Sequence, residues 1–386
     1  MQNNSRRNFL AKLAGLSAGL MAQPSDLLSG GTASDYKEKV AIDLANKYHY
    51  KYLKTKITDL VDKLGGLSDI VKPGDRVGIK VNLTGGKEKA ELSMDRYGLH
   101  AGETFWSNPM VTRIVAELFK DAGAGDIYFM EASYDGMDSF VYGGFDEAAR
   151  HVGATLIDLN YKDPYDSWTT RAIANYYRWA DWPMHGLLSE IDCFVSIPKM
   201  KQHVTAGVTH AMKNLIGIVP LEIEKYSLGA SHRKGLHTDE EGNNSQDSLV
   251  RAIVDLNSAR PIHFSLVDGI YTETGPEGTW GKQQFVPIQP GLMIAGKNSV
   301  SVDSVSTALM GFDPEANDYS QPFVYCMNYL RMADEERGLG PHNLADIEIV
   351  GKIIDEVKYN WTPLKKAAEQ KSEQDPDELL PYAGTL

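Results

Sequence analysis

Short strand-like runs alternate with amphipathic helical segments along the first half of the chain. Residues 76–83 alternate in polarity, residues 126–131 are largely apolar, and a helical pattern begins between them at Ser107-Asn108-Pro109. At such a start a serine or asparagine accepts free amides, and proline suits the first helical turn. The same order returns as a helix over 145–152 and a strand over 154–159. This alternation with short links predicts an α/β fold with a mainly parallel sheet flanked by helices.

The remaining segments extend this pattern toward the carboxyl terminus. Strands are expected at 191–196, 263–270, 291–296 and 347–350, helices at 35–64, 299–310, 322–333 and from 247, a loop at 272–278 and a covering insertion at 160–190. Because 386 residues exceed a typical single domain, the length allows either one large α/β unit or two lobes, and of these we expect two Rossmann-like lobes with a cleft between them. The lobes would span residues 35–260 and 261–358, followed by a polar tail at 363–386.

The first residues have the features of an export signal. Arg6 and Arg7 form a twin arginine followed by Phe9-Leu10, and residues 11–22 supply a short, weakly apolar core. This pattern is typical of a Tat signal, which we place at residues 1–30. The Tat translocase is then a partner during export, and the mature protein works in the periplasm or another extracytoplasmic space. No window reaches the roughly 18 to 20 apolar residues that span a bilayer, so we expect no membrane-spanning segment after processing.

Charge and cysteine content argue against two classes of function. A formal net charge of −13 opposes the basic surface that nucleic-acid binding needs. The chain has two cysteines, Cys193 in an expected strand and Cys326 in an expected helix. We expect both to be buried, inert thiols. Because four cysteines hold a typical iron–sulfur cluster, no such cluster is expected within one chain.

Residues 197–220 carry the densest chemistry in the sequence. They follow the apolar run 191–196, so their first polar side chains emerge at the carboxyl end of an expected strand, where open α/β sheets bind ligands. Lys199 and Lys201 are interpreted either as ligands for an anion or as a solvated pair at the strand end. Lys213 has apolar neighbours, and we expect its amine to be partly buried. Such a lysine can lose its proton and become a base or a covalent nucleophile.

Histidines and carboxylates near this stretch suggest further chemistry. The histidines gathered within thirty-five residues are His203, His210, His232 and His237. Their spacing matches no standard metal signature, and His210 is interpreted equally as a core residue or a ligand. The carboxylates available for a metal or for acid–base chemistry are Asp268, Glu273 and Asp303. For Asp303 we favour a different interpretation, in which its negative charge stabilises the first turns of its own helix.

The order and spacing of several motifs resemble the domain of unknown function family 362. The motifs are Lys80-Val81-Asn82, residues 198–203, residues 209–217, His232-Arg233, residues 267–270 with Gly275-Pro276, and residues 302–305. The resemblance covers about residues 70 to 350. It implies an α/β fold but no settled reaction. Many members also carry ferredoxin-like cysteines, which this chain lacks.

A more distant resemblance is to the nickel-pincer lactate racemases. These enzymes place a histidine, then an Ala-Gly pair and then a lysine, and His203, Ala206-Gly207 and Lys213 keep that spacing. The resemblance implies an acid–base role for His203, tethering or contact of the cofactor by Lys213, and metal ligation by His232. The two adjacent glycines before the racemase lysine are not matched by residues 209–212.

Together these features predict an exported enzyme that acts on an anionic small molecule. Its catalytic residues would be His203 and Lys213, and the residues expected to bind substrate are Lys80, Asn82, Lys199, Lys201, Asn214 and Arg233. The expected metal ligands are His232, His237 and Asp268. The cofactor would be a transition metal or a nickel-containing organic cofactor, and the enzyme a racemase, an epimerase or an oxidoreductase. The alternative is a periplasmic metal- or anion-binding protein that catalyses no reaction.

Overall fold

The computed structural model describes residues 37–228, 233–243, 245–275, 277–279 and 285–364. The predicted export signal lies outside these residues, as do His232, Pro276 and the tail from residue 365. The described residues from Glu38 onward group into one unit by their contacts.

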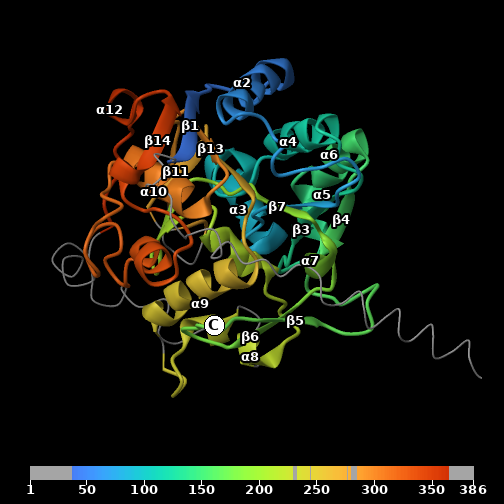
Figure 1. Cartoon of the computed structure of the whole chain (residues 1–386), viewed down its shortest axis with the longest axis vertical. Coiled ribbons are helices and arrows are strands. Elements are labelled where there is room, and N and C mark those ends of the chain that lie inside the picture. Colours follow the sequence, from blue (N-terminus) through green and yellow to red (C-terminus); the bar gives the residue numbers. More distant parts are fainter. Residues whose placement is uncertain (1–36, 229–232, 244, 276, 280–284, 365–386) are drawn as a thin grey trace, which may run out of the picture. The chain divides into compact units, whose positions relative to one another are not determined.

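Within the described residues, one eight-stranded sheet has the strand order β14-β1-β13-β10-β7-β2-β3-β4 (Figure 1). Its strands are β1 (Glu38–Leu44), β2 (Val77–Lys80), β3 (Ile127–Glu131), β4 (Thr155–Asp158), β7 (Cys193–Ser196), β10 (Phe264–Gly269), β13 (Leu292–Gly296) and β14 (Ile347–Gly351). Neighbouring strands are parallel except where β13 runs antiparallel to β1 and β10. The prediction of a mainly parallel sheet flanked by helices is confirmed.

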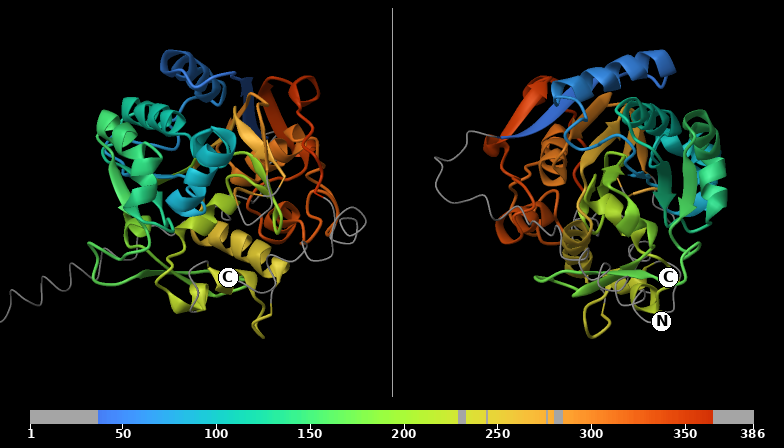
Figure 2. Two further views of the ribbon diagram at one scale, coloured as in Figure 1. Left: turned by 180° about the vertical axis from the view of Figure 1, so that it is seen from behind. Right: turned by 45° about the vertical axis from the view of Figure 1, so that its right-hand side comes forward.

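Side chains alternate between the two faces of the sheet, and each face has its own core. In β13, Leu292 and Ile294 pack in one core while Met293 and Ala295 pack in the other, as the two-residue period of a strand requires. A strand that is apolar on both faces needs a helical layer on each side. Helices α2 (Tyr50–Lys63), α4 (Pro109–Asp121) and α6 (Phe145–Val152) cover one face, and α9 (Gln246–Ala259), α10 (Ser299–Leu309) and α11 (Tyr329–Arg331) cover the other. In Figure 2 the blue α2 and the yellow α9 lie on opposite sides of the sheet.

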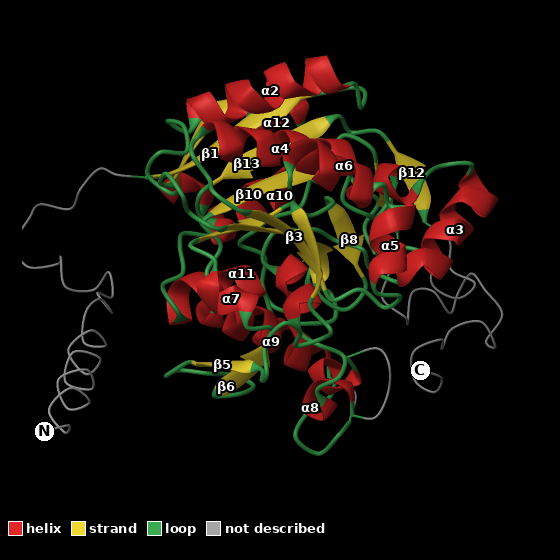
Figure 3. Cartoon of the chain, turned by 90° about the vertical axis from the view of Figure 1, so that its right-hand side faces the viewer, coloured by secondary structure: helices red, strands yellow, loops and turns green. Residues whose placement is uncertain are grey.

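The remaining elements lie outside the main sheet. They are the helices α3 (Gly86–Tyr97), α5 (Met137–Tyr142), α7 (Leu187–Glu190), α8 (Glu224–Ser227) and α12 (Ile354–Val357), the two-stranded sheets β5 (Thr169–Ala172) with β6 (Asp181–Met184), β8 (Lys201–His203) with β9 (Gly207–Thr209) and β11 (Thr272–Thr274) with β12 (Val286–Ile288), the 3₁₀ turns η2 (Ala101–Glu103), η3 (Lys213–Ile218), η4 (Lys234–His237) and η6 (Leu344–Asp346), and the π-helical turn η5 (Met332–Glu336). Residues 160–190, predicted as a covering insertion, contain β5, β6 and α7. The β5–β6 sheet lies on the far side of α9 from the main sheet (Figure 3), where Asp255 of α9 accepts the amides of Tyr177 and Arg178 at 2.8 and 2.7 Å.

The predicted division into two lobes at residue 260 is not found in the described residues. β10 pairs with β7, and β1 lies between β13 and β14. Strands from both predicted lobes therefore belong to one sheet. The two predicted lobes share this sheet because strands far apart in the sequence pair with each other. The local pattern of apolar residues does not predict such long-range pairing. The candidate site consequently lies at an edge of this sheet and not between two lobes.

The predicted helix over 35–64 is wrong in its first part. Residues 38–44 form β1, which pairs with a strand on each side, and α2 begins only at Tyr50. Their Lys-Val-Ala-Ile run suits a buried strand as well as a helix, and pairing with β13 and β14 decides between the two.

Two predictions near the carboxyl end are also wrong. Residues 272–274, predicted as a loop, pair with β12. The helix expected over 322–333 begins only after Asn328, whose side chain accepts the amide of Leu330 at 3.0 Å. Cys326 thus lies outside a helix. Both cysteines are nevertheless free and buried, as predicted.

The chain adds strands to one side of β2 first and then to its other side, so the strand order reverses at β2. β3 follows β2 on one side, whereas β7 lies on the other side. Open α/β sheets bind ligands outside the carboxyl ends of their strands at such a point. Lys80 ends β2 and Ser196 ends β7, and these two residues are register partners. Glu131 ends the neighbouring β3. The side chains at this edge therefore define where a site is expected.

Candidate functional site

Lys80 forms a buried ion pair at the carboxyl end of β2. Its Nζ lies 2.8 Å from Oε2 of Glu131 and 3.2 Å from Oδ1 of Asn214, and the Lys80 side chain is 0% exposed. The amide of Leu83 donates to the same Glu131 oxygen at 3.0 Å. Burial lowers the pKa of Lys80 to about 8, and the charge of Glu131 opposes this shift. Lys80 and Asn214, both predicted to bind substrate, are thus brought together and bond to each other.

Gly217 lies directly against this ion pair. A Cβ at this position would overlap Oε1 of Glu131 and Nζ of Lys80. The Gly217 carbonyl also accepts the amide of Ala132, the residue after Glu131, at 2.7 Å. The backbone of η3 can approach the pair this closely only because residue 217 has no side chain.

Glu277 joins three predicted site residues. Its Oε1 lies 3.2 Å from Nζ of Lys201, and its Oε2 lies 2.5 Å from Nε2 of His203 and 3.6 Å from Nζ of Lys213. Lys201 also donates to the carbonyl of Phe105 at 3.0 Å, and its side chain is 0% exposed. Burial lowers the pKa of Lys201 to about 8. The carboxylate of Glu277 is therefore the centre on which these three basic side chains converge.

The hydrogen bonds of His203 fix its tautomer. Nδ1 accepts the amides of Thr205 and Ala206, both at 3.1 Å, so it carries no proton. The proton is therefore on Nε2, which faces Glu277 at 2.5 Å. Burial lowers the pKa of His203 well below its ordinary value, and the charge of Lys213 lowers it further. Both observations describe a neutral imidazole that donates to a carboxylate.

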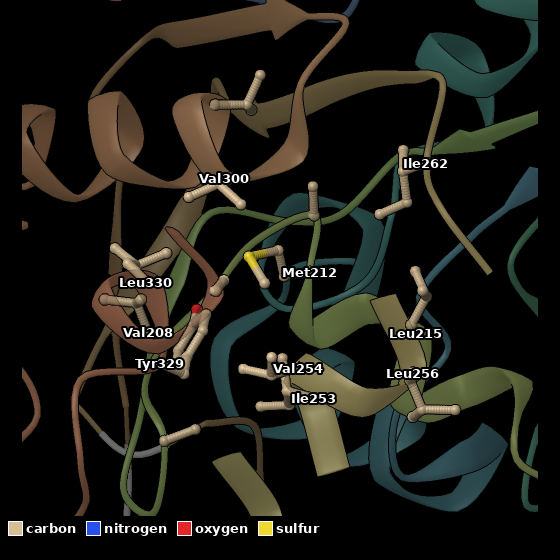
Figure 4. Close-up of a cluster of buried hydrophobic side chains, with 14 of the residues drawn as sticks. Val208, Met212, Leu215, Ile253, Val254, Leu256, Ile262, Val300, Tyr329 and Leu330 are labelled. Carbon is tan, nitrogen blue, oxygen red and sulfur yellow. The ribbon is translucent and has the colours of Figure 1, made fainter. Parts of the chain in front are cut away.

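Core packing and one carboxylate hold the backbone at Lys213. Met212 and Leu215 are buried, and Figure 4 shows them in the cluster of apolar side chains that includes residues of α9. Asp303 of α10 accepts the amides of Ala211 and Met212 at 2.8 and 3.0 Å. Burial raises the pKa of Asp303 to about 8, whereas the two amides lower it. Asp303 was predicted to be a negative charge that stabilises the start of its own helix. In the structure it accepts hydrogen bonds from the backbone just before η3 and so fixes the start of that turn.

The amine of Lys213 lacks a hydrogen-bond partner among the described residues. Its side chain is 9% exposed, and the 3.6 Å separation from Oε2 of Glu277 exceeds hydrogen-bond distance. Burial lowers the pKa of Lys213 well below its ordinary value, and the charges of Lys201 and Arg233 lower it further. A lysine in this environment holds its proton weakly, so its amine is available as a base or a nucleophile.

Arg233 and His237 complete the basic side chains near Lys213. Arg233 is buried and donates through Nε to the carbonyl of Val219 at 2.9 Å and through Nη2 to the carbonyl of Ala132. Burial lowers the pKa of His237 to about 4, and the charges of Lys213 and Arg233 contribute. We call the following set the basic cluster: Lys80, Lys201, His203, Lys213, Arg233 and His237, with the carboxylates Glu131, Glu273 and Glu277.

Lys199 and Asp268 form a separate buried ion pair. Nζ of Lys199 lies 2.7 Å from Oδ2 of Asp268, and both side chains are 0% exposed. The same Nζ is within hydrogen-bond distance of Oη of Tyr48 and the carbonyls of Gly102 and Tyr271. These oxygens occupy the donors of the ammonium group, and Asp268 also accepts from Tyr48. The solvated-pair interpretation of Lys199 and Lys201 is therefore wrong, since neither is exposed.

Other predicted residues occupy buried positions without ligand-like partners. Nε2 of His210 lies 3.2 Å from Sδ of Met310, and burial lowers the pKa of His210 to about 3, so we interpret it as a neutral core residue. Oδ1 of Asn82 is buried and has no hydrogen-bond partner among the described residues. Glu273 accepts the amide of Gly278 at 2.8 Å, its other oxygen has no partner in the part of the chain that the structure describes, and burial raises the pKa of Glu273 to about 7.

The predicted metal ligands are Asp268, His237 and His232, and the structure describes the first two of them. Among the described residues, no group of three or more His, Cys, Asp or Glu side chains is placed to hold a metal ion. Asp268 is paired with Lys199, whereas His237 lies near Lys213. His232 lies outside the described residues. Ligation by His232 and His237 stays a prediction.

Sequence reasoning missed the two glutamates that organise the basic cluster. Glu131 ends a parallel strand, so the rule that ligands bind at the carboxyl ends of such strands could have selected it. Glu277 lies in the segment after β11, and no local pattern marks a glutamate there as the partner of residues more than sixty positions earlier. That contact exists only in the folded chain.

We expect Asp303→Ala to destabilise the protein, because it leaves two buried amides without acceptors. The cost should be about 1–3 kcal/mol for each amide, measured as the change in unfolding free energy in urea. Asp303→Asn is the matched control, since its side-chain oxygen can still accept one amide. An alanine variant as stable as the wild type would show that Asp303 does not hold the start of η3.

Fold and site define an α/β protein with a buried basic cluster at the carboxyl edge of its sheet, where the strand order reverses. The chain belongs to the family described as Domain of unknown function (DUF362), whose model matches residues 77–308. This match confirms the family resemblance. The matched span contains the basic cluster and Asp303. The resemblance to nickel-pincer lactate racemases stays a prediction.

Two similar proteins provide further context. A thylakoid-associated protein of Synechocystis sp. is 24% identical over 282 residues, which cover 72% of this chain and 76% of that protein. A crystal structure of a Thermotoga maritima protein is similar over 64% of this chain and 55% of that chain, with a TM-score of 0.35 and 11% identity. In the part of the chain that the structure describes, no helix combines the length and apolar character needed to cross a bilayer.

Proposed function

We propose that this protein is an enzyme that binds an anionic small molecule beside Lys213 and moves a proton on it. The observation that carries the proposal is the Lys213 amine, which is 9% exposed and has no hydrogen-bond partner among the described residues. A buried ammonium that makes no hydrogen bond is unfavourable, and the Glu277 carboxylate 3.6 Å away is too distant to accept one. A fold retains such a group where a ligand provides the partner, and perturbed lysines of this kind concentrate at functional sites.

The charges of the basic cluster favour an anion. Without Lys213, the basic side chains Lys80, Lys201 and Arg233 still outnumber the carboxylates Glu131 and Glu277, and burial raises the pKa of the third carboxyl, Glu273, to about 7, which favours its uncharged form. Burial lowers the pKa of each lysine in the cluster. An incoming carboxylate or phosphate would restore charge balance and would receive the hydrogen bonds that the Lys213 amine lacks.

Two side chains of the cluster are suited to proton transfer. The weakly basic amine of Lys213 can accept a proton from a carbon next to the anionic group of the ligand. His203 carries its proton on Nε2 and shares the carboxylate of Glu277 with Lys213. Glu277 therefore links a base and a proton donor. This arrangement favours racemase or epimerase chemistry among the predicted reactions.

Proton transfer to solvent tests the enzyme proposal. The protein would be incubated in D₂O with a panel of 2-hydroxy and 2-oxo carboxylates, and loss of the C–H signal would be followed by proton NMR. Hydrogen–deuterium exchange at a C–H group that occurs only in the presence of the protein supports the proposal that it is an enzyme. Saturable binding without exchange of any panel member would instead make it an anion-binding protein.

We expect anion binding to be coupled to proton uptake. The pKa of Lys213 is lowered in the free protein, and a bound anion raises it, so the complex holds more protons than the separate partners. Affinity should therefore increase as pH falls between these two pKa values. Calorimetry in buffers of different ionisation enthalpy measures the uptake. Lys213→Met should abolish it and the exposed-lysine control Lys352→Met should not; equal uptake in both variants would contradict the proposal.

Two further parts of the proposal rest on the sequence. We place the mature protein outside the cytoplasm after Tat export, supported by the twin arginine at Arg6 and Arg7 and by the thylakoid-associated relative. A metal-containing centre near His237 and His232 would give the site a Lewis acid. Elemental analysis of the protein purified from its native compartment tests the metal: stoichiometric transition metal supports it, and metal-free active protein rejects it.

A further inference from the structure

We propose that Lys213 is a covalent nucleophile, and that the ligand carries a carbonyl group next to its anionic group, as a 2-oxo carboxylate does. This inference rests on the proposed function, because it names the substrate class of the same site. The bond would be an imine between Nζ of Lys213 and the carbonyl carbon. Imine formation requires an uncharged amine that a substrate can reach, with a proton donor beside it.

Lys213 meets the first requirement better than the other lysines at this edge. Lys80 donates to Glu131 and Asn214, Lys199 is paired with Asp268, and Lys201 is bonded to Glu277 and Phe105. Each of these three side chains is 0% exposed. Lys213 alone among these four has no hydrogen-bond partner in the described residues, and its side chain keeps 9% exposure.

Glu277 and His203 meet the second requirement. Oε2 of Glu277 lies 3.6 Å from Nζ of Lys213 and 2.5 Å from Nε2 of His203. A proton released by the attacking amine can therefore pass through the glutamate, and the N–H of His203 can supply a proton to the carbonyl oxygen. Both groups share one carboxylate, so neither proton has to come from bulk solvent.

The reaction balances without another reagent. The amine nitrogen attacks the carbonyl carbon, an N–C bond forms, and the carbonyl π electrons move to oxygen. The resulting carbinolamine loses its hydroxyl group, and both hydrogens of the neutral amine leave with that oxygen as one water. The imine then withdraws electrons from the neighbouring carbon, which makes a C–H bond there more acidic. In this route Lys213 is the imine nitrogen and no longer the base, so the proton leaves the carbon on the other side of the imine from the carboxylate, and Glu277, 3.6 Å from Nζ, is the nearest carboxylate among the described residues that can accept it.

Positive charge near Lys213 can hold the carboxylate of such a ligand. Arg233 uses Nε and Nη2 for two backbone carbonyls, which leaves further N–H groups of the guanidinium for an anion. His237 lies close enough for Lys213 and Arg233 to lower its pKa. A carboxylate bound here would place the adjacent carbonyl carbon beside the amine.

Borohydride trapping tests the inference. The full-length protein would be incubated with pyruvate, glyoxylate or 2-oxoglutarate and sodium borohydride, and analysed by intact mass and peptide mapping. We expect one reduced adduct per chain on the peptide with Lys213, no adduct with lactate, and loss of the adduct in Lys213→Arg. Lys352→Arg is the matched control and should keep it.

The outcomes separate this inference from the proposed function. Calorimetric binding of these anions without any borohydride adduct would overturn the imine and leave the anion site standing. An adduct that persists in Lys213→Arg would also overturn it. Absence of both binding and adduct would overturn the proposed function itself. Circular dichroism of Lys213→Arg establishes that loss of the adduct does not reflect loss of the fold.

Discussion

Replacing Glu131 by alanine should destabilise the protein by about 3–5 kcal/mol, the range for removing one partner of a buried ion pair. Lys80 would remain, with its side chain 0% exposed and its main counter-charge gone. The amide of Leu83 would lose its acceptor as well. Urea denaturation, compared as unfolding free energy with the wild type, measures the loss.

Two companion variants make this prediction specific. Lys80→Met combined with Glu131→Leu removes both charges, and we expect it to cost less than Glu131→Ala, because apolar pairs of similar volume often replace buried ion pairs without penalty. Gly217→Ala should destabilise by steric overlap, since its Cβ would meet both members of the pair. A Glu131→Ala variant within about 1 kcal/mol of the wild type would show that the pair is not needed for the fold.

Replacing Lys213 by methionine should reduce substrate C–H exchange by about 10²–10⁴-fold, the typical contribution of a general base, without destabilising the fold. The reason is the sign of the pKa shift. The folded protein lowers the pKa of Lys213, so folding disfavours the ammonium form that the unfolded chain holds below its ordinary pKa of 10.5. Methionine removes that penalty. The variant should be at least as stable as the wild type at neutral pH, and its advantage should shrink as pH rises toward 10.5.

Exchange rates and unfolding curves at several pH values test both halves of this prediction. Lys352→Met, at an exposed position, is the matched control and should change neither quantity. Unchanged exchange in Lys213→Met would remove Lys213 from the mechanism. A large loss of stability would show that Lys213 is a structural residue.

Local patterns predict most of the fold because period and capping are local properties. The start of α4 was predicted from Asn108 and Pro109, and Oδ1 of Asn108 accepts the amide of Met110 at 2.9 Å. The β1 segment was predicted as a helix because its strand conformation depends on pairing with β13 and β14. These two strands come about 250 or more residues later in the chain. The pairing of β7 with β10, which joins strands of the two predicted lobes in one sheet, is non-local in the same way.

The site was predicted in part. The rule that ligands bind at the carboxyl ends of parallel strands selected residues 197–220, and the structure places Lys201, His203 and Lys213 of this stretch in the basic cluster together with Lys80 from the family motif. The rule also selected Lys199, which the fold uses for an ion pair with Asp268. A sequence shows which side chains emerge at an edge. It does not show which lysines pair with carboxylates from distant parts of the chain and which keep an amine without a hydrogen bond.

The central claim is that the amine of Lys213 is held with a weakly bound proton in the free protein. Carbon-13 NMR of protein labelled at the lysine ε-carbon measures this directly, with the Lys213 signal assigned by its absence from Lys213→Met. We expect that signal to titrate well below the ordinary pKa of 10.5 and to shift upward when an anion binds. Titration at the ordinary value, unaffected by any anion of the panel, would contradict the account.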